Sequence, residues 1–317
     1  MFDTPVLFLV FNRPDTTRRV FAAIREVRPK RLFIAADGPR AEVAGEEALC
    51  TSLRRELLAA IDWDCQVETL FREKNLGCRP AVNEALNWFF THVREGIILE
   101  DDCLPAADFF PFCSSMLEKY RDSQQVAMVG GTSLLEDRGQ TKDSYFFSKH
   151  FAIWGWATWQ DRWQSLRRDS LVDWLDNKRR GWLKGIFTNR HVVAFYTSVF
   201  DKDREGRLDT WDVFWNYSLL LHDKLTITPV VNLVSNIGTS GLHAAVADRR
   251  FMNMPTGSFD PVTAAAPLTI AWNKELDAIQ YENTGLGRFS WKVSLRSWAK
   301  RCGVLIPALW LKKRLRS

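Results

Sequence analysis

The sequence predicts an α/β protein built on a mostly parallel sheet that is flanked by helices. In the first hundred residues, short apolar runs alternate in strict order with amphipathic helical patterns, as they do in βαβ units. The chain is 46% hydrophobic and 26% charged, which is ordinary for a soluble globular protein with a large core. Polar motifs follow the ends of three predicted strands, which is where parallel sheets bind their ligands.

The N-terminal part of this pattern begins with the continuous apolar run 6–11, which predicts a buried strand that ends at Arg13-Pro14-Asp15. Residues Val20 and Ile24 belong to an apolar stripe with 3–4 spacing, which predicts a helix. The same two patterns repeat up to residue 99. They predict strands at 6–11, 31–36, 66–71 and 96–99, and helices at 16–27, 46–61 and 79–93.

The alternation fades after residue 105, and residues 244–287 show no clear pattern. The remaining segments predict helices at 107–120, 170–205 and 210–222, and strands at 126–129 and 228–234. No flexible linker separates this part from the first. We therefore expect one domain with two halves, 1–105 and 106–287, followed by a distinct tail, 288–317.

Tryptophan is unusually frequent in the second half. The chain has 14 tryptophans, and eight of them lie between Trp154 and Trp215. Such a cluster indicates either a thick core or a surface that binds flat, partly apolar ligands such as sugar rings. We expect a Trp-rich elaboration of the same sheet.

The net charge of +5 is distributed unevenly. Residues 288–317 carry nine basic residues and no acid, so the preceding residues carry a net charge of −4. A mildly acidic body does not favour nucleic-acid binding. The tail interleaves its basic residues with Trp298, Trp310 and leucines, a pattern typical of amphipathic helices that lie on anionic membranes. The alternative is a terminal helix that packs its apolar face on the domain.

The six cysteines form no CxxC pair and no zinc-ligand spacing, which indicates reduced thiols in a cytosolic protein. We find no apolar stretch of the about 20 residues that span a membrane. The N-terminus lacks the basic segment of a secretory signal. We therefore expect a cytoplasmic protein that the tail can hold peripherally on the inner face of the membrane.

The triplet Glu100-Asp101-Asp102 directly follows a predicted strand. Adjacent carboxylates repel one another, and hard divalent cations such as Mg²⁺ or Mn²⁺ bind such oxygen ligands and bridge them to diphosphates. The alternative is a solvated acidic turn or an N-cap for the next helix.

Three other motifs follow strand ends. Asp37, before a glycine, can accept hydrogen bonds from a nucleobase or ribose, or it can form an ordinary Asp-Gly turn. Arg13 can contact a diphosphate as a forked donor, or it can be a surface arginine beside Pro14. The stretch 75–83 contains Gly77 and joins a strand to a helix N-terminus, which attracts anions.

Two acids lie at the predicted start of the helix 210–222. Asp209 suits an N-cap, and Asp212, three residues on, is a candidate general base; the alternative is a second acid that interacts with the helix dipole. Farther on, His243 follows the glycine-containing loop 235–241 and is a candidate metal ligand, although a lone histidine is more often structural.

Taken in order, these motifs resemble the nucleotide-sugar domain of GT-A glycosyltransferases over about residues 5–243. The pattern Asn75-x-Gly77-x-x-x-Ala81-x-Asn83 resembles family 2 enzymes. The acidic triplet is more similar to family 13, the N-acetylglucosaminyltransferase I family. Three downstream segments are also similar to that family, namely 153–159, Trp211-Asp212 and 238–241.

The resemblance implies a GT-A fold and a role for each matching residue. Asp102 would ligate Mn²⁺ or Mg²⁺, and Asp101 would lie by the ribose or assist through water. Arg13 and Asp37 would hold the nucleoside, and Ser240 would touch the donor phosphate. Asp212 would be the catalytic base.

The remaining assignments are less direct. No residue matches the nucleoside-contacting histidine of family 13, and Arg79 is the nearest candidate. Trp154, Trp156 and Trp211 would form walls for the donor or acceptor. The sequence thus predicts a metal-dependent, inverting hexosyl- or N-acetylhexosaminyl-transferase that moves a sugar from a nucleotide diphosphate sugar to a glycan or lipid-linked acceptor. The alternatives are a nucleotidyltransferase and a non-catalytic carbohydrate-binding protein.

Overall fold

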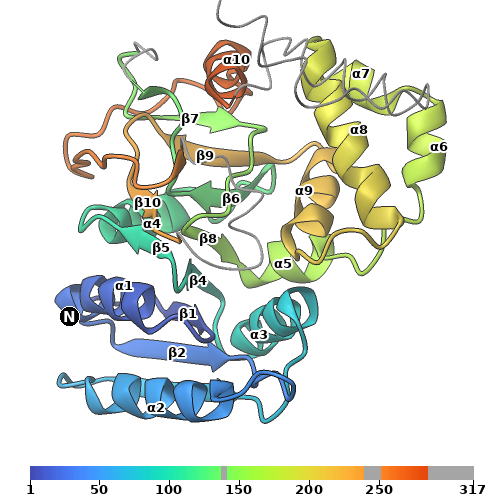
Figure 1. The fold of residues 1–317 in the computed structure, drawn as a ribbon. Coiled ribbons are helices and arrows are strands. Elements are labelled where there is room, and N and C mark those ends of the chain that lie inside the picture. Colours follow the sequence, from blue (N-terminus) through green and yellow to red (C-terminus); the bar gives the residue numbers. More distant parts are fainter. Residues whose placement is uncertain (137–140, 239–250, 285–317) are drawn as a thin grey trace, which may run out of the picture.

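The computed structural model describes residues 1–136, 141–238 and 251–284 (Figure 1). Ser240, His243 and the basic tail 288–317 lie outside the described residues, so the predictions for them stay predictions. Among the described ranges, no helix has the length and apolar character needed to cross a bilayer.

The centre of the molecule is one eight-stranded sheet, which confirms the predicted mostly parallel α/β architecture. Its order is β3-β2-β1-β4-β8-β6-β9-β7, and only β8 and β7 run against the other strands. Its strands are β1 (Val6–Val10), β2 (Arg31–Ala36), β3 (Gln66–Phe71), β4 (Glu95–Glu100), β6 (Val126–Gly130), β7 (Tyr145–Ser148), β8 (Trp156–Trp159) and β9 (Leu225–Pro229). Because the sheet continues past residue 105, the division into halves there is not visible as a break.

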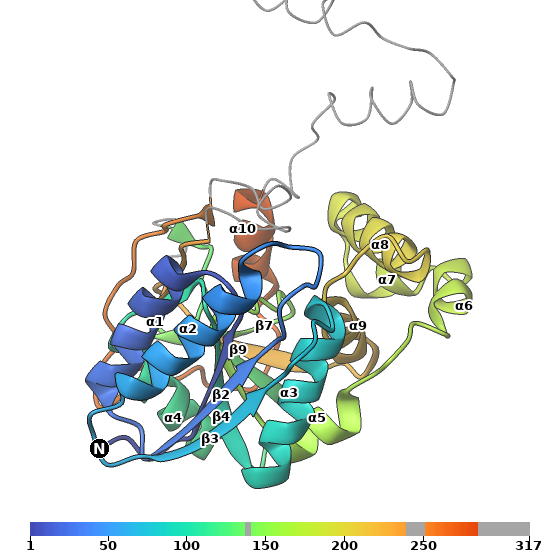
Figure 2. The same cartoon turned by 60° about the horizontal axis from the view of Figure 1, so that its bottom comes forward.

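Helices cover both faces of the first four strands (Figure 2). Phe8 of β1 packs on the face that is covered by α1 (Pro14–Val27) and α2 (Glu46–Ala59). Its neighbour Leu7 packs on the opposite face, against α3 (Cys78–His92). Because both faces are covered, β1 is buried at every position and reads in the sequence as a continuous apolar run.

The helices of the second half are shorter than the sequence predicts. The helices are α4 (Phe109–Lys119), α5 (Gln160–Leu166), α6 (Trp174–Arg179), α7 (Trp182–Ile186), α8 (Arg190–Arg204), α9 (Asp212–Leu221) and α10 (Lys274–Asn283). The predicted helix 170–205 is wrong as one helix. It is divided into α6, α7 and α8, because Gly181 adopts a left-handed φ of +69° and Asn189 caps a new helix start.

The predicted strand 228–234 is also wrong. The chain instead forms β9, which ends at Pro229, and a separate strand β10 (Val234–Asn236). β10 pairs with β5 (Cys103–Pro105) in a small antiparallel sheet, directly after the acidic triplet. A proline cannot donate to a strand ladder, so β9 ends there and β10 is free to turn toward the triplet.

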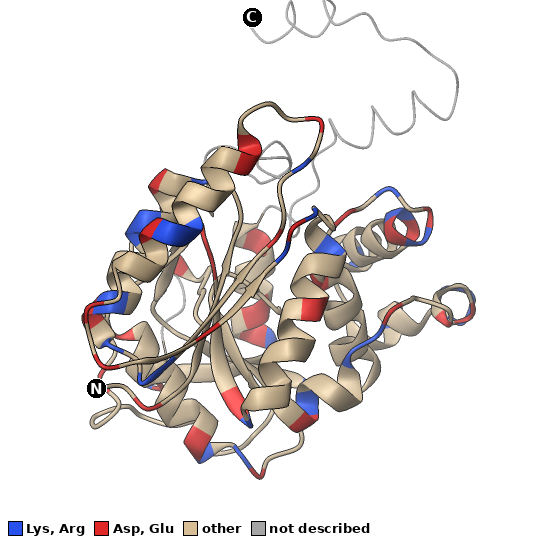
Figure 3. Ribbon diagram, turned by 90° about the horizontal axis from the view of Figure 1, so that it is seen from below, with Lys and Arg blue, Asp and Glu red and all other residues tan. Residues whose placement is uncertain are grey.

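Charged residues lie mainly on helices and connecting loops, while the central strands contain few of them (Figure 3). The exceptions that matter lie at the carboxyl ends of β1, β2 and β4. Arg13, Asp37 and Glu100-Asp101-Asp102 all follow or end these neighbouring strands.

Candidate functional site

A cleft lies at the carboxyl edge of the sheet and consists of two adjoining compartments. The smaller compartment has a volume of about 270 Å³ and is bordered by β1, β2 and the start of α3. The larger compartment has a volume of about 540 Å³ and extends from Asp102 to α9 and α10. Cys78 and Glu100 line both, so the two compartments meet at these residues.

The guanidinium of Arg13 bridges two members of the acidic triplet. It pairs with Asp101, and its Nη1 donates to Asp102 Oδ2 over 2.6 Å. Asp101 is almost fully buried, and it also accepts from the backbone N–H of Phe11. Burial raises the pKa of Asp101 to about 6, although Arg13 opposes that shift. Arg13 therefore lies where the sequence predicts, but its charge is directed at carboxylates.

Glu100 is the residue of the triplet to which the sequence analysis assigned no role. It lines both compartments and accepts a hydrogen bond from Trp211 Nε1 over 3.2 Å. Burial, together with the charge of Asp102, raises its pKa to about 8. A carboxyl group at this junction can therefore carry a proton near neutral pH.

Asp37 organises the loop beside the smaller compartment. Its carboxylate accepts hydrogen bonds from Asn75 Nδ2 and from the backbone N–H groups of Leu76 and Gly77. Burial raises its pKa, while those backbone donors oppose the shift. Asp37 lines the compartment, and much of its hydrogen-bonding capacity holds the loop in place.

The smaller compartment combines small apolar walls with polar groups. Ala35, Ala81 and Ala85 leave room for a flat group, because their side chains end at Cβ. Arg40 and Asn12 lie at its rim, where both donate to the buried carboxylate of Glu46.

The larger compartment holds the predicted base. Asp212 is the first residue of α9, and it lines this compartment together with Asp102, Trp154 and Trp211. Thr210 Oγ1 donates to Asp212 Oδ1. The structure thus brings the predicted metal ligand, the predicted base and two predicted wall residues to one cavity.

The N-cap prediction for Asp209 is wrong. α9 begins at Asp212 after Trp211, and Asp209 lies in the preceding loop. Its Oδ1 instead accepts from the backbone N–H of Arg79 over 3.4 Å, in the first turn of α3. The start of α3 at Gly77 has no capping side chain of its own, so a carboxylate from a distant segment supplies the acceptor.

The structure gives Arg79 contacts other than those predicted. Its guanidinium pairs with Asp203, donates to the carbonyls of Leu208 and Thr210, and stacks over the ring of Phe214 at 4.4 Å. Arg79 is absent from the described residues that line the two compartments. Its predicted contact with a nucleoside therefore finds no support in this geometry.

Trp156 requires a correction as a wall residue. Its side chain is 0% exposed, because β8 lies between β4 and β6 in the middle of the sheet. Its ring stacks on Trp211 with centroids 5.5 Å apart. Trp156 thus supports the wall from behind. Trp154 and Trp211 line the larger compartment, and Trp211 is only 2% exposed.

Two further residues of the larger compartment were not predicted from the sequence. His150 and Asn216 line it, and each has a buried polar atom, Nδ1 and Oδ1 respectively, without a hydrogen-bond partner. Burial lowers the pKa of His150 to about 4, so its imidazole is neutral at physiological pH. The only available signals were an isolated histidine in a loop and an asparagine one turn after Asp212.

Within the described ranges, no three histidine, cysteine, aspartate or glutamate side chains come together as a ready metal cage. Asp102 is the carboxylate that both lines the larger compartment and ends the acidic triplet. A divalent ion at this point would need further ligands, which a diphosphate and water supply in sites of this type.

Comparisons with known proteins give low similarity. No family model and no curated protein sequence matches the chain. Among solved structures, the chain is similar to HddC from Yersinia pseudotuberculosis at 9% identity and a TM-score of 0.31, covering 50% of this chain and 77% of that one.

Two other solved structures are similar at the same level. The glycosyltransferase GlyE of Streptococcus pneumoniae TIGR4 has 10% identity and a TM-score of 0.33, covering 95% of this chain and 64% of GlyE. The apo form of a UDP-glucose pyrophosphorylase also has 10% identity and a TM-score of 0.33, covering 72% of this chain and 90% of that one. Likeness at this level does not identify a function.

Proposed function

We propose that this protein is a glycosyltransferase that binds a nucleotide diphosphate sugar in the smaller compartment and an acceptor in the larger one. The observation that carries the proposal is the joining of the two compartments at Glu100, with Asp102 and Asp212 in the same larger cavity. A base and a diphosphate site facing one cavity are what transfer to a hydroxyl requires.

The smaller compartment suits a nucleoside. Its alanine walls accept a flat base, and the acceptors and donors of Asp37, Asn12 and Arg40 lie at its edge. A diphosphate that extends from it reaches the junction at Glu100 and then Arg13 and Asp102 in the larger compartment. Arg13 is a forked donor that can exchange one carboxylate partner for phosphate oxygens.

A divalent cation, Mn²⁺ or Mg²⁺, fits this donor set in part. Asp102 provides a hard carboxylate oxygen at the cavity wall, and the acidic surroundings attract a cation. When bound, the ion would neutralise charge on the leaving diphosphate. Asp102 would hold it, and Arg13 would have to move from Asp102 Oδ2 or share that carboxylate.

Asp212 is proposed to take the proton from the acceptor hydroxyl. Thr210 holds one of its oxygens, which directs the carboxylate and leaves the other toward Asn216, whose Nδ2 is 3.4 Å away. With the donor on one side and the base on the other, a single displacement would invert the anomeric configuration. Trp154 and Trp211 would pack against the sugar rings.

Two alternatives make different predictions in the same assay. A nucleotidyltransferase would join a sugar phosphate to a nucleoside triphosphate and release pyrophosphate. A carbohydrate-binding protein without catalysis would leave every donor intact.

The test is incubation of the full chain with a panel of UDP-, GDP- and dTDP-sugars, Mn²⁺ and a pool of glycan acceptors. Release of nucleoside diphosphate with a new glycan of inverted configuration supports the proposal. Pyrophosphate release from nucleoside triphosphate and sugar phosphate would move the protein to the first alternative. No turnover with any donor, together with glycan binding, would favour the second.

A further inference from the structure

We infer that Arg79 is a positioning residue that fixes the segment 208–210 and thereby aims the carboxylate of Asp212 into the larger compartment. This inference rests on the proposed function, because it assigns to Asp212 the role of base. It gives Arg79 a place in the reaction that differs from nucleotide binding.

Arg79 connects α3, the end of α8 and the segment 208–210. It lies in the first turn of α3, and its guanidinium reaches Asp203 near the end of α8. Its Nη2 donates to the carbonyl of Leu208 over 2.9 Å, and its Nε donates to the carbonyl of Thr210 over 3.0 Å. One side chain thus holds the end of α8 and both ends of the segment 208–210.

Thr210 connects this segment to the proposed base, Asp212. The backbone of Thr210 is held by Arg79, and its side chain donates to Asp212 Oδ1. The N-cap residue of α9, Trp211, makes no capping hydrogen bond with its side chain, so the cap does not hold the helix start. The position of Thr210 therefore directs one oxygen of the Asp212 carboxylate, while Asn216 Nδ2 donates to the other over 3.4 Å.

The contacts at position 79 use properties that are specific to arginine. A guanidinium is planar, presents five N–H donors in a fixed geometry and stacks on aromatic rings, whereas a lysine ammonium does not. The Arg79 guanidinium uses these properties together, because it stacks over Phe214 of α9 while its edge bonds to Asp203 and two carbonyls. Lysine would keep the charge and lose the geometry.

The ion pair between Arg79 and Asp203 contributes to the stability of the folded protein. Asp203 is 6% exposed, and burial raises its pKa even though Arg79 lies beside it. Removal of Arg79 would leave this buried carboxylate without its cation, which is strongly destabilising. Substitution by lysine keeps a positive charge near Asp203, so it is the appropriate variant for testing geometry.

The test compares Arg79→Lys with Arg162→Lys. Arg162 is a matched control because it also pairs with an aspartate, donates to a backbone carbonyl and lies over an aromatic ring, but at the opposite edge of the sheet. Hydrogen–deuterium exchange is measured over 208–214 in both variants and in the unsubstituted protein. We expect faster exchange there in Arg79→Lys and no change in Arg162→Lys.

The same variants are then assayed for turnover of the active donor. We expect Arg79→Lys to lower kcat about 10–100-fold with the donor KM unchanged, since displacement of a catalytic group by about 1 Å has effects of this size. Arg162→Lys should change thermal stability and not kcat. In an Asp212→Asn background, Arg79→Lys should have no further effect, because the group that it positions is gone.

The possible outcomes distinguish the positioning role of Arg79 from the proposed function. Unchanged exchange over 208–214 in Arg79→Lys overturns the positioning role whatever the activity. Multiplicative losses of kcat in Arg79→Lys/Asp212→Asn also overturn it, as does a rise in donor KM alone, which would indicate nucleotide binding. Faster exchange over 208–214 in Arg79→Lys, without turnover of any donor, would support the positioning role of Arg79 and contradict the proposed function.

Discussion

The two ends of strand β4 carry the same residue type in opposite surroundings. Glu95 begins the strand at the amino edge of the sheet and pairs with Arg121, whose Nη2 donates to Glu95 Oε1 over 2.9 Å. Glu100 ends the strand at the carboxyl edge, where it borders two compartments and has Asp101 and Asp102 as neighbours.

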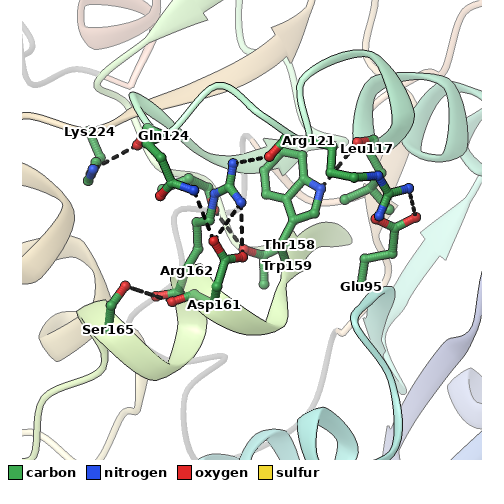
Figure 4. A network of polar contacts seen from close by, with 11 residues as sticks. Glu95, Leu117, Arg121, Gln124, Thr158, Trp159, Asp161, Arg162, Ser165 and Lys224 are labelled. Carbon is green, nitrogen blue, oxygen red and sulfur yellow. Dashed lines mark hydrogen bonds and ion pairs between the residues drawn. The ribbon is translucent and has the colours of Figure 1, made fainter.

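The amino edge is a network of charged and polar side chains that bond to one another (Figure 4). Arg162 donates to both oxygens of Asp161 and to the carbonyl of Arg121, and Gln124 donates to Asp161 over 3.0 Å. Although burial acts in the opposite direction, the hydrogen bonds from Gln124 and Arg162 hold the pKa of Asp161 below its usual value. This edge has the character of a structural network.

The carboxyl edge has the opposite balance. Arg13 is shared by Asp101 and Asp102, and the pKa values of Glu100 and Asp101 are raised, first of all by burial. Unbalanced acids beside a cavity store free energy that a cation or a proton can release. An acid at a strand end is therefore informative through its surroundings, and these surroundings favour ligand binding at the carboxyl edge.

The largest expected effect separates two acids that occupy the first turns of α9 and α5. Asp212→Asn should lower turnover about 10²–10⁴-fold with donor affinity retained, because an amide cannot take the proton from the hydroxyl group of the acceptor substrate. Asp161→Asn at the amino edge should leave turnover unchanged. Steady-state kinetics of both variants checks this, and equal losses in both would erase the distinction between the edges.

Glu100 at the end of β4 should make the stability of the protein depend on pH. The folded-state pKa of Glu100, about 8, lies above the ordinary 4.5, so the folded protein holds this proton more tightly than the unfolded chain does. The stability from this group is therefore fully present below about pH 4.5 and is lost as the pH rises toward 8.

Glu100→Gln should accordingly flatten the fall in urea midpoint between pH 5 and pH 8. Chemical denaturation of this variant and of the unsubstituted protein in parallel measures the difference. A slope that is unaffected by Glu100→Gln would show that Glu100 is ionised throughout this range.

The affinity for Mn²⁺ should respond to the arginine at the carboxyl edge. Arg13→Gln removes a positive charge from Asp101 and Asp102, so binding of Mn²⁺ without nucleotide should become at least about tenfold tighter. Arg18→Gln on the same helix is the control, since Arg18 is exposed and pairs with Glu56. Titration calorimetry measures both, and an unchanged or weaker affinity in Arg13→Gln would argue against a cation at Asp102.

The smallest expected effect concerns the acid that caps α3. Asp209→Asn should change the free energy of unfolding by only a few tenths of a kcal/mol, because asparagine caps helices about as well as aspartate. Asp209→Ala should cost about 1 kcal/mol. Urea denaturation distinguishes them, and equal losses would show that the charge of Asp209 matters and the cap does not.

The sequence was sufficient for the parts of the fold that follow local periodicity. The strands 31–36 and 66–71 agree with β2 and β3 at both ends, since buried β2 leaves a continuous apolar run and the partly exposed edge strand β3 leaves an alternating pattern. β8 was missed because a central strand of the sequence Trp-Ala-Thr-Trp has no length and no alternation to detect. Its tryptophans therefore looked like ligand contacts.

The same limit applies to the site. The rule for strand ends placed Asp37 and Asp102 at one edge, and the structure places them there. Arg79 was assigned to a nucleoside because its partners, Asp203 and the carbonyls of 208–210, are more than 120 residues away in the chain. Long side chains choose partners by tertiary contact, which spacing along the sequence does not encode.

The central claim is that ligands bind at the carboxyl edge of the sheet, and hydrogen–deuterium exchange with the best donor from the nucleotide-sugar panel tests it most directly. Saturating donor with Mn²⁺ should slow exchange in 75–81 and 100–104 and leave 94–96 and 159–165 unchanged. Slower exchange at the amino edge, or no change in 75–81 and 100–104 with a donor that binds, would contradict the assignment of the cleft as the site.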